Sequence, residues 1–363
     1  MKKRWTYKNA GDPSIVEGLM KSLGVDRVLA TLLAQRGIET YEQAEKFFRP
    51  KLENLYDPYL MKGMKEAVER IEKAIQDKEK ILIYGDYDVD GTTAVALVYS
   101  FLRKQYNNIE NYIPDRYSEG YGISYKGIEF AQEHGFSLII ALDCGIKAVD
   151  KIEHAKEKGI DFIICDHHLP GDHIPDAVAV LDPKRTDCPY PFKELSGCGV
   201  GFKLMQGYCK LKGIPLSELY PFLDLVAVSI ASDIVPVTDE NRILGYYGLK
   251  QLNAAPSKGL KAIIKLAGIE KHDITIDDIV FRIGPRINAS GRMESGKSSV
   301  DLLCAESDAI AFEMGSVVNS CNNDRRFVDR AITEEALLLV ASDTELQKKK
   351  STVLFNPDRK STR

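Results

Sequence analysis

The sequence predicts an α/β protein: a doubly wound, mainly parallel five-stranded sheet, with an N-terminal helical extension before it and a long C-terminal connecting helix after it. Two patterns in the 363 residues predict this fold. Between residues 81 and 181, short apolar runs alternate with helical segments, as in strands joined by crossover helices. On both sides of that region, apolar residues recur at the spacing of one helix face.

The residues before the sheet are predicted to form helices. Apolar side chains recur there every three or four residues, which is the period of a helix face. The polar run DKEK, residues 77–80, closes the stretch. The apolar positions are Val25, Val28, Leu29, Leu32 and Leu33, then Met64, Val68, Ile71 and Ile75.

Five apolar runs are predicted to form the sheet. Most of them end in polar or glycine residues, at the carboxyl edge where open α/β sheets place their ligands. Beyond residue 198 the pattern is mostly helical, and a long helical stretch runs from Ser299 to about Leu346. The five runs are ILIY (81–84), NYI (111–113), SLIIAL (137–142), DFIIC (161–165) and AVAVL (177–181).

The composition excludes several classes of protein. No apolar run approaches the ~20 residues that a membrane-spanning helix needs, and the amino terminus lacks the apolar stretch of a secretory signal, so we expect a cytoplasmic protein. The seven cysteines contain no CxxC pair, which disfavours a disulfide framework or structural zinc. Because the formal net charge is -4, any nucleic-acid binding needs a local basic groove.

Three carboxylates follow the first apolar run, at Asp86, Asp88 and Asp90. Like charges this close repel unless a cation lies among them. If the segment is extended, alternate residues share a face and can converge on one ion. A solvated acidic turn remains an alternative. An EF-hand loop is excluded, because its twelfth position is Leu97 and the segment follows a strand-like run.

Further polar clusters end three later apolar runs: Asp143-Cys144-Gly145, Asp166-His167-His168, and Asp233. Each alone is more often a helix cap or a satisfied polar group. Their recurrence predicts a shared site, and imidazole mixed with carboxylates suits Mn²⁺ better than Ca²⁺. Two such cations can hydrolyse a phosphodiester without a protein nucleophile. Covalent catalysis is disfavoured because no GxSxG motif is present.

The order DYDVDG, DCG, DHH and SDIVP resembles the four motifs of the DHH phosphoesterase superfamily. The leader LLAQRGIETYEQAEKFFRP and the segment RINASGRM resemble its RecJ-type single-strand DNA exonucleases. The resemblance extends to about Pro357. It implies a single-stranded-DNA-specific 5′→3′ exonuclease of DNA recombination and repair, a hydrolase that binds single-stranded DNA and works as a monomer, with a single-strand-binding protein or a helicase as further partners.

The resemblance also implies a dinuclear site holding Mn²⁺, or Mg²⁺, in which Asp143 bridges both ions. His168 would face the scissile phosphate as a donor. Many relatives have a histidine ligand four residues before Asp88, where this chain has Tyr84, so the first ion is expected to bind more weakly or to rely on Asp86. The other implied ligands are Asp86 and Asp88 for the first ion, and Asp90, His167 and Asp233 for the second.

Residues 291–298, GRMESGKS, match the phosphate-binding pattern GxxxxGK[ST] letter for letter. The context is wrong for an NTPase, because such a loop directly follows the first strand of its domain. Arg286, Asn288 and Arg292 could instead donate to phosphate oxygens, and the resemblance places them beside the DHH site. A solvated loop with a structural arginine is the alternative.

Two further segments are candidates for substrate contact. The segment YIPDRYSEGYGIS combines Arg116 with Tyr121 and other tyrosines, a mixture that suits base stacking with phosphate contact, although tyrosines near a strand end are as often core. The glycines of residues 196–201 permit a close backbone approach, and the helix that they begin could meet an anion with its amide end.

Two other functions stay open: a DHH phosphodiesterase acting on short oligonucleotides, cyclic dinucleotides or pyrophosphate, and an inactive fragment that only binds nucleic acid. Because RecJ-type relatives continue into an accessory domain, we also expect this chain to be C-terminally truncated. The expected division is an N-terminal helical extension (1–75), a DHH catalytic core (76–240), a helical phosphate-contact segment (241–298), a connecting helix (299–350) and the truncated start of the accessory domain, with a strand from Ser351 (351–363).

Overall fold

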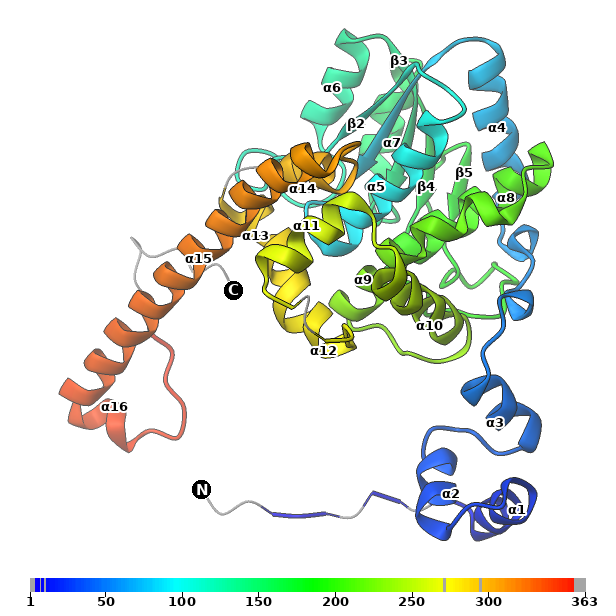
Figure 1. Ribbon diagram of the computed structural model, residues 1–363. Helices are drawn as coiled ribbons and strands as arrows, with labels where there is room; N and C mark the ends of the chain where they lie inside the picture. The colour runs from blue at the N-terminus through cyan, green and yellow to red at the C-terminus, as the bar shows by residue number, and fades with distance from the viewer. Residues whose placement is uncertain (1–3, 7, 10, 270–271, 294–295, 356–363) are drawn as a thin grey trace.

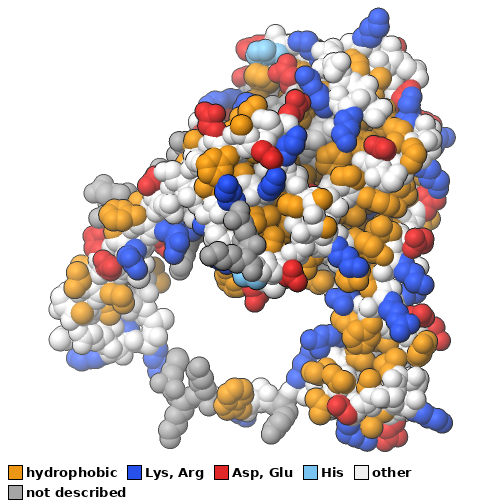
Figure 2. Space-filling model, in the orientation of Figure 1, with side chains coloured by type: hydrophobic (Ala, Val, Ile, Leu, Met, Phe, Trp, Pro, Cys, Tyr) orange, Lys and Arg blue, Asp and Glu red, His pale blue; other side chains and the backbone are white. Residues whose placement is uncertain are grey.

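The computed structural model describes residues 4–6, 8–9, 11–269, 272–293 and 296–355. A parallel sheet with its flanking helices forms the main body (Figure 1). Three N-terminal helices, α1 (Pro13–Leu23), α2 (Arg27–Ala34) and α3 (Tyr41–Phe48), lie below that body in this view, and the long helix α15 (Asp308–Ser342) projects from it. In the space-filling view a wide gap separates the outer end of α15 from the N-terminal extension (Figure 2), whereas Phe47 of the extension contacts Arg242 of the body. The predicted fold class is confirmed.

The sheet has five strands, all parallel, in the order β2-β1-β3-β4-β5. Each predicted run forms one of them. β1 pairs with β2 on one side and with β3 on the other. The sheet therefore grows in one direction from β1 to β2 and in the opposite direction from β1 through β3 to β5. The strands are β1 (Lys80–Gly85), β2 (Ile109–Tyr112), β3 (Phe136–Leu142), β4 (Asp161–Cys165) and β5 (Ala179–Leu181).

Helices cover both faces of the sheet. Ile81 and Ile83 of β1 point into a core with α4, α5 and α8, whereas Leu82 and Tyr84 point into a core with α6 and α7. Alternation along the strand sends neighbouring residues to opposite faces, and this makes the sheet doubly wound. The helices are α4 (Met64–Gln76), α5 (Val89–Arg103), α6 (Tyr125–Glu133), α7 (Val149–Glu157) and α8 (Gly197–Lys212).

The helices after α8 extend the α5 side of the core. Leu225, Ile263 and Ile283 are buried in the same apolar cluster as Val95 of α5. These helices are α9 (Leu223–Ser232), α10 (Asp239–Ala254), α11 (Lys258–Leu266), α12 (Ile276–Asp278), a π-helix (Ile279–Ile283), α13 (Gly284–Met293) and α14 (Gly296–Leu303). Short 3₁₀ turns occupy Leu52–Asn54, Pro58–Leu60, Leu216–Glu218 and Tyr220–Phe222.

The N-terminal extension packs around a small core of its own. Six buried residues form it: Val16, Leu19, Ala30, Leu33, Ile38 and Ala44. Side chains of Asp12, Asp26 and Thr40 cap the three helices by accepting from backbone amides, which satisfies donors that a helix start leaves free. The helices are α1 (Pro13–Leu23), α2 (Arg27–Ala34) and α3 (Tyr41–Phe48).

The C-terminal part consists of α15 (Asp308–Ser342) and the short α16 (Thr344–Lys348). Buried residues of α15 reach only as far as Asn322, so its second half projects from the body (Figure 1). Residues 351–355, where the first strand of the accessory domain is expected to begin, form no strand, and a strand there would have no sheet to join, which makes it unstable in water. Residues 356–363 lie outside the described part. In the described ranges, no helix is both long and apolar enough to cross a membrane.

Candidate metal centre

The first carboxylates leave the sheet at the carboxyl end of β1. Asp86 follows the strand directly, and Asp88 caps α5 by accepting from the amide of Gly91 at 3.0 Å. Asp90 lies in the first turn of α5, so the expectation of an extended segment with all three carboxylates on one ion is wrong. The turn of the helix sends Asp90 to a different group of side chains.

Asp143 follows β3 at the neighbouring strand end. Its backbone has a φ of 60°, a left-handed conformation that is costly for a residue with a Cβ and that often marks a functional site. The Asp143 amide donates to Cys165 O of the next strand at 2.8 Å. A Cβ on Gly197 would lie 2.6 Å from Asp143 Oδ1. The close backbone approach predicted for the glycine run therefore occurs against this carboxylate.

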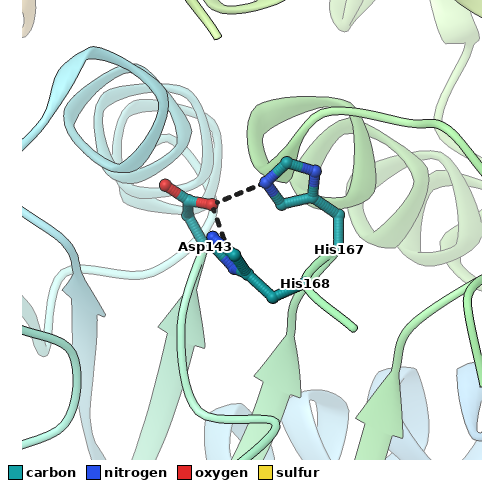
Figure 3. A group of neighbouring side chains, drawn as sticks. All are labelled: Asp143, His167 and His168. Carbon is teal, nitrogen blue, oxygen red and sulfur yellow. Dashed lines mark ion pairs between the residues drawn. The ribbon is translucent and has the colours of Figure 1, made fainter. Parts of the chain in front are cut away.

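The two histidines follow β4 and face Asp143 (Figure 3). His167 Nε2 lies 3.1 Å from Asp143 Oδ1, 3.6 Å from Asp90 Oδ2 and 3.7 Å from Asp233 Oδ2. His168 Nδ1 lies 4.0 Å from Asp143 Oδ1. Carboxylates from β3, α5 and the end of α9 thus meet one imidazole from β4.

All the side chains expected as ligands, and His168 with them, belong to overlapping groups at this edge of the sheet. In each group the candidate ligand atoms lie within 4.8 Å of one another. Asp143 and His167 each belong to more than one group, so the groups adjoin each other. The groups are Asp86, Asp88 and Asp143; Asp90, His167 and Asp233; and Asp143, His167 and His168.

The amide end of α8 meets an anion that belongs to the chain itself. Asp90 accepts from the amides of Gly197 and Cys198, each at 2.7 Å, and from Ser229 Oγ at 2.7 Å. The start of a helix favours negative charge in this position. These bonds orient the Asp90 carboxylate toward His167, while the oxygens keep further lone pairs for a cation.

Asp166 was not among the site residues expected from the sequence, although it belongs to the DHH motif itself. Its Oδ1 accepts from the amides of His167 and His168 and from His168 Nδ1, the last at 2.7 Å. Its Oδ2 accepts from the Ile146 amide at 2.9 Å. Hydrogen bonding from His168 lowers the pKa of Asp166 despite its burial, and the same bond raises the pKa of His168.

The grouped carboxylates repel one another. Burial, and then the charge of neighbouring aspartates, raises the pKa of Asp86 to about 7 and that of Asp233 to about 6. The pKa of Asp143 is raised well above its ordinary value for the same two reasons. Among the described residues, both buried oxygens of Asp86 have no hydrogen-bond partner. Buried, unsatisfied carboxylates of this kind fit a divalent cation.

Tyr84 does not belong to this centre. It lies on the other face of β1, buried with Ile123 and Cys144, and its hydroxyl donates to Gly122 O at 2.9 Å. With tyrosine at position 84, the group for the first ion consists of Asp86, Asp88 and Asp143.

Two predicted substrate contacts lie at the rim of the centre. The Tyr121 hydroxyl is 3.2 Å from His168 Nε2, and its ring meets those of His168 and Tyr87 edge-on, each at 6.1 Å. The guanidinium of Arg116 lies over the Tyr87 ring, 5.2 Å from its centroid. Tyr121 is 55% exposed, so its ring could meet a base.

The other predicted contacts lie in α13, which packs against the first motif. A Cβ on Gly291 would lie 2.7 Å from Tyr87 O, so this helix passes close to the carboxylates. Arg286 already donates to Asn319 and to Arg282 O, and Asn288 is partly buried in the same helix. The side chain of Arg292 lies outside the described part. Residues 284–293 form a helix, so the alternative of a solvated loop is wrong for them.

Residues 80–230 match the model of the DHH family, N-terminal domain. These residues form a DHH-family domain. It is 42% identical to the single-stranded-DNA-specific exonuclease RecJ of Bacillus subtilis (strain 168), over 93% of this chain and 42% of that protein. It is 33% identical to RecJ of Escherichia coli (strain K12), over 86% of this chain and 55% of that protein. The chain therefore spans about half the length of these curated DHH relatives.

Solved DHH structures resemble the fold. RecJ of Thermus thermophilus in complex with Mn²⁺ superposes with a TM-score of 0.76 and 26% identity, covering 90% of this chain and 46% of that one. A manganese-bound exonuclease RecJ superposes with a TM-score of 0.71 and 29% identity, covering 80% and 72%. Those structures contain Mn²⁺, and the acidic and histidine groups of this DHH site are positioned to bind divalent cations.

Proposed function

We propose that this chain carries the catalytic domain of a single-stranded-DNA-specific exonuclease that hydrolyses phosphodiesters with two divalent cations, preferably Mn²⁺, with Mg²⁺ as the alternative. The observation that carries the proposal is the pair of ligand groups that adjoin at Asp143 and His167. Two cations so placed activate a water and neutralise the charge on a phosphodiester. The RecJ proteins named as single-stranded-DNA-specific exonucleases support the choice of substrate.

Within this proposal the ligands would divide between two ions, and Asp143 would serve both of them. Its buried carboxylate lies in one group with two side chains of the first motif and also faces His167. His167 would hold its ion through Nε2, because that nitrogen points at the carboxylates. Asp86 and Asp88 would hold the first ion; Asp90, His167 and Asp233 would hold the second.

His168 acts as a donor to the scissile phosphate. Its Nδ1 is occupied by Asp166 at 2.7 Å, so this nitrogen is not free to bind a cation. Its Nε2 points to the rim, where the Tyr121 hydroxyl lies 3.2 Å away. Asp166 raises the pKa of His168, which favours the doubly protonated ring, the form in which Nε2 can donate to a phosphate oxygen.

The strand is held at the rim of the centre, where the loop that carries Arg116 and α13 both approach Tyr87. Tyr121 stacks on a base and Arg116 binds phosphate, while Arg286, Asn288 and Arg292 in α13 contact the nucleic-acid backbone or its terminal phosphate. The whole enzyme would degrade strands from the 5′ end as a cytoplasmic monomer of DNA recombination and repair, together with a single-strand-binding protein or helicase.

The test is release of mononucleotides from a labelled single strand in Mn²⁺, with a duplex of the same sequence, a dinucleotide and pyrophosphate as parallel substrates. Strands labelled at either end report polarity. Turnover of the single strand alone supports the exonuclease. If only the small substrates turn over, the chain is a small-phosphodiester hydrolase, and if the strand binds without turnover, it is a binding fragment.

A further inference from the structure

The loop between β2 and α6, residues 113–124, carries Arg116 and Tyr121 to the rim of the DHH site. It has little regular structure, and Gly120 and Gly122 adopt left-handed φ values of 86° and 74°. Tyr121 is exposed between them, and the His168 ring is the only partner its hydroxyl has at this rim among the described residues. Its position therefore depends on how the backbone on each side is held.

Tyr84 holds the backbone that follows Tyr121. Its hydroxyl donates to Gly122 O at 2.9 Å and accepts from the Ser124 amide at 3.1 Å. The ring is buried and stacks on Tyr112 with a centroid distance of 5.4 Å and an interplanar angle of 19°. One buried hydroxyl thus fixes the peptide groups on both sides of Ile123.

Glu119 ties the beginning of the loop to its end. Its carboxylate accepts from the Asp115 amide at 2.8 Å, from Ser124 Oγ at 2.5 Å and from the Tyr112 hydroxyl at 3.0 Å. Ser124 Oγ also accepts from the Gly127 amide at 2.9 Å, which caps α6. Hydrogen bonds to a charged acceptor are the stronger kind, so the loop is closed at its base.

We propose that Tyr84, Glu119 and Ser124 form a latch of positioning residues for the reaction. The latch holds the loop so that Tyr121 lies on His168 and Arg116 lies on Tyr87, ready to receive the strand end. This inference rests on the proposed function, which gives those two residues a substrate to contact. Tyr84 lies on the opposite face of β1 from α5 and acts only through the loop.

The first experiment is a double-mutant cycle on the chain with Mn²⁺ and a single-stranded substrate, using Tyr84→Phe, Tyr121→Phe and the double variant. The Phe ring at position 84 keeps the stack on Tyr112 and removes only the hydroxyl. We expect each single substitution to lower kcat/KM by about 3- to 12-fold, within the range that one hydrogen bond contributes. The kcat/KM of the double variant should be no lower than that of the less active single variant, because the effects of residues that act together are not additive.

A matched control is Tyr106→Phe. The Tyr106 hydroxyl donates to Glu79 O at 2.6 Å, at the opposite end of β1. This variant therefore loses a bond from a tyrosine to a backbone carbonyl, as Tyr84→Phe does, but not the additional bond that Tyr84 accepts from the Ser124 amide. We expect its kcat/KM to stay within about twofold of the wild type, because no site residue depends on that bond. Melting temperatures of all variants show how much of any effect is loss of stability.

The second measurement needs no turnover. Hydrogen exchange of the amides of residues 120–124 should be faster in Tyr84→Phe than in the wild type and unchanged in Tyr106→Phe. Unchanged exchange in Tyr84→Phe, or single effects that multiply in the double variant, would overturn the latch. A wild type that turns over no phosphodiester would instead refute the proposed function, and hydrogen exchange would then decide the latch alone.

Discussion

Replacing Asp166 with asparagine is the most informative single substitution, because this carboxylate orients both histidines of the centre. Four donors converge on it: three on Oδ1, including His168 Nδ1, and the Ile146 amide on Oδ2. An asparagine that keeps its oxygen toward the histidines turns its amino group toward the Ile146 amide, where two donors meet. The variant therefore loses one bond to a buried charged acceptor and the charge beside His168.

The expected cost is about 1.5–3 kcal/mol, the contribution of a hydrogen bond to a charged group. If this loss falls on the contact between His168 and the phosphate, kcat decreases about 10- to 150-fold, since ~1.36 kcal/mol corresponds to a factor of ten. The loss of the carboxylate also lowers the pKa of His168, which Asp166 raises in the wild type. A step that needs the protonated ring then fails at a lower pH, so the alkaline limb of kcat shifts toward acid.

The assay is kcat against pH in saturating Mn²⁺ and single-stranded DNA. Asp182→Asn is the matched control: Asp182 is a buried carboxylate at the end of neighbouring β5, and burial raises its pKa to about 7. Neutralising it should change kcat less than about twofold, because it accepts from the Lys184 amide and, unlike Asp166, from neither histidine of the centre among the described residues. An Asp166→Asn variant with wild-type kcat and an unmoved alkaline limb would refute the role given to this carboxylate.

Three further predictions follow from the buried charges. Asp143→Ala should abolish turnover and weaken Mn²⁺ binding in calorimetry, yet raise the melting temperature in chelator, because it removes one of several repelling carboxylates; an active variant would contradict the bridging role. In chelator, the melting temperature should fall as pH rises from about 4 to about 7, because the raised pKa values of Asp86 (about 7) and Asp233 (about 6) make the folded state bind more protons than the unfolded state. Mn²⁺ should remove that loss, and a melting temperature that rises over this range would refute it. Lys203→Met breaks a fully buried pair with Glu240 at 3.1 Å and should lower the free energy of unfolding in urea by about 3–5 kcal/mol; a change below about 1 kcal/mol would contradict this.

Much of the sheet was predictable because a buried parallel strand must be apolar on both faces. The runs from ILIY to AVAVL are short and end in polar residues, so their strands and the ligand edge were visible in sequence. The boundaries of α5 were not, since DYDVDG reads equally well as an extended turn. The helix starts at Val89, inside the motif, and this start separates Asp90 from Asp86 and Asp88.

Other features of the site depend on contacts between distant parts of the chain. Asp166 was adjacent to the expected ligands, but four donors to one carboxylate can be counted only when the strands are in place. The helix start at Ser196 predicted an anion, and only packing could reveal that Asp90 is that anion. Tyr84 differs from the histidine that many relatives have at this position, and only the fold shows that its hydroxyl has a partner, Gly122 O, in the loop at the rim of the site.

The sequence by itself determined the order of strands and helices along the chain and the residue types at each strand end, because apolar periodicity and charge are properties of the chain. Tertiary structure alone decided which oxygen faces which nitrogen. Parallel pairing in register brings Gly85, Leu142 and Cys165 level with one another, so the carboxylates and imidazoles that follow share one edge. Hydrogen bonds between residues far apart in the chain, such as those from Gly197 and Cys198 to Asp90, then set their directions, and no local pattern encodes those.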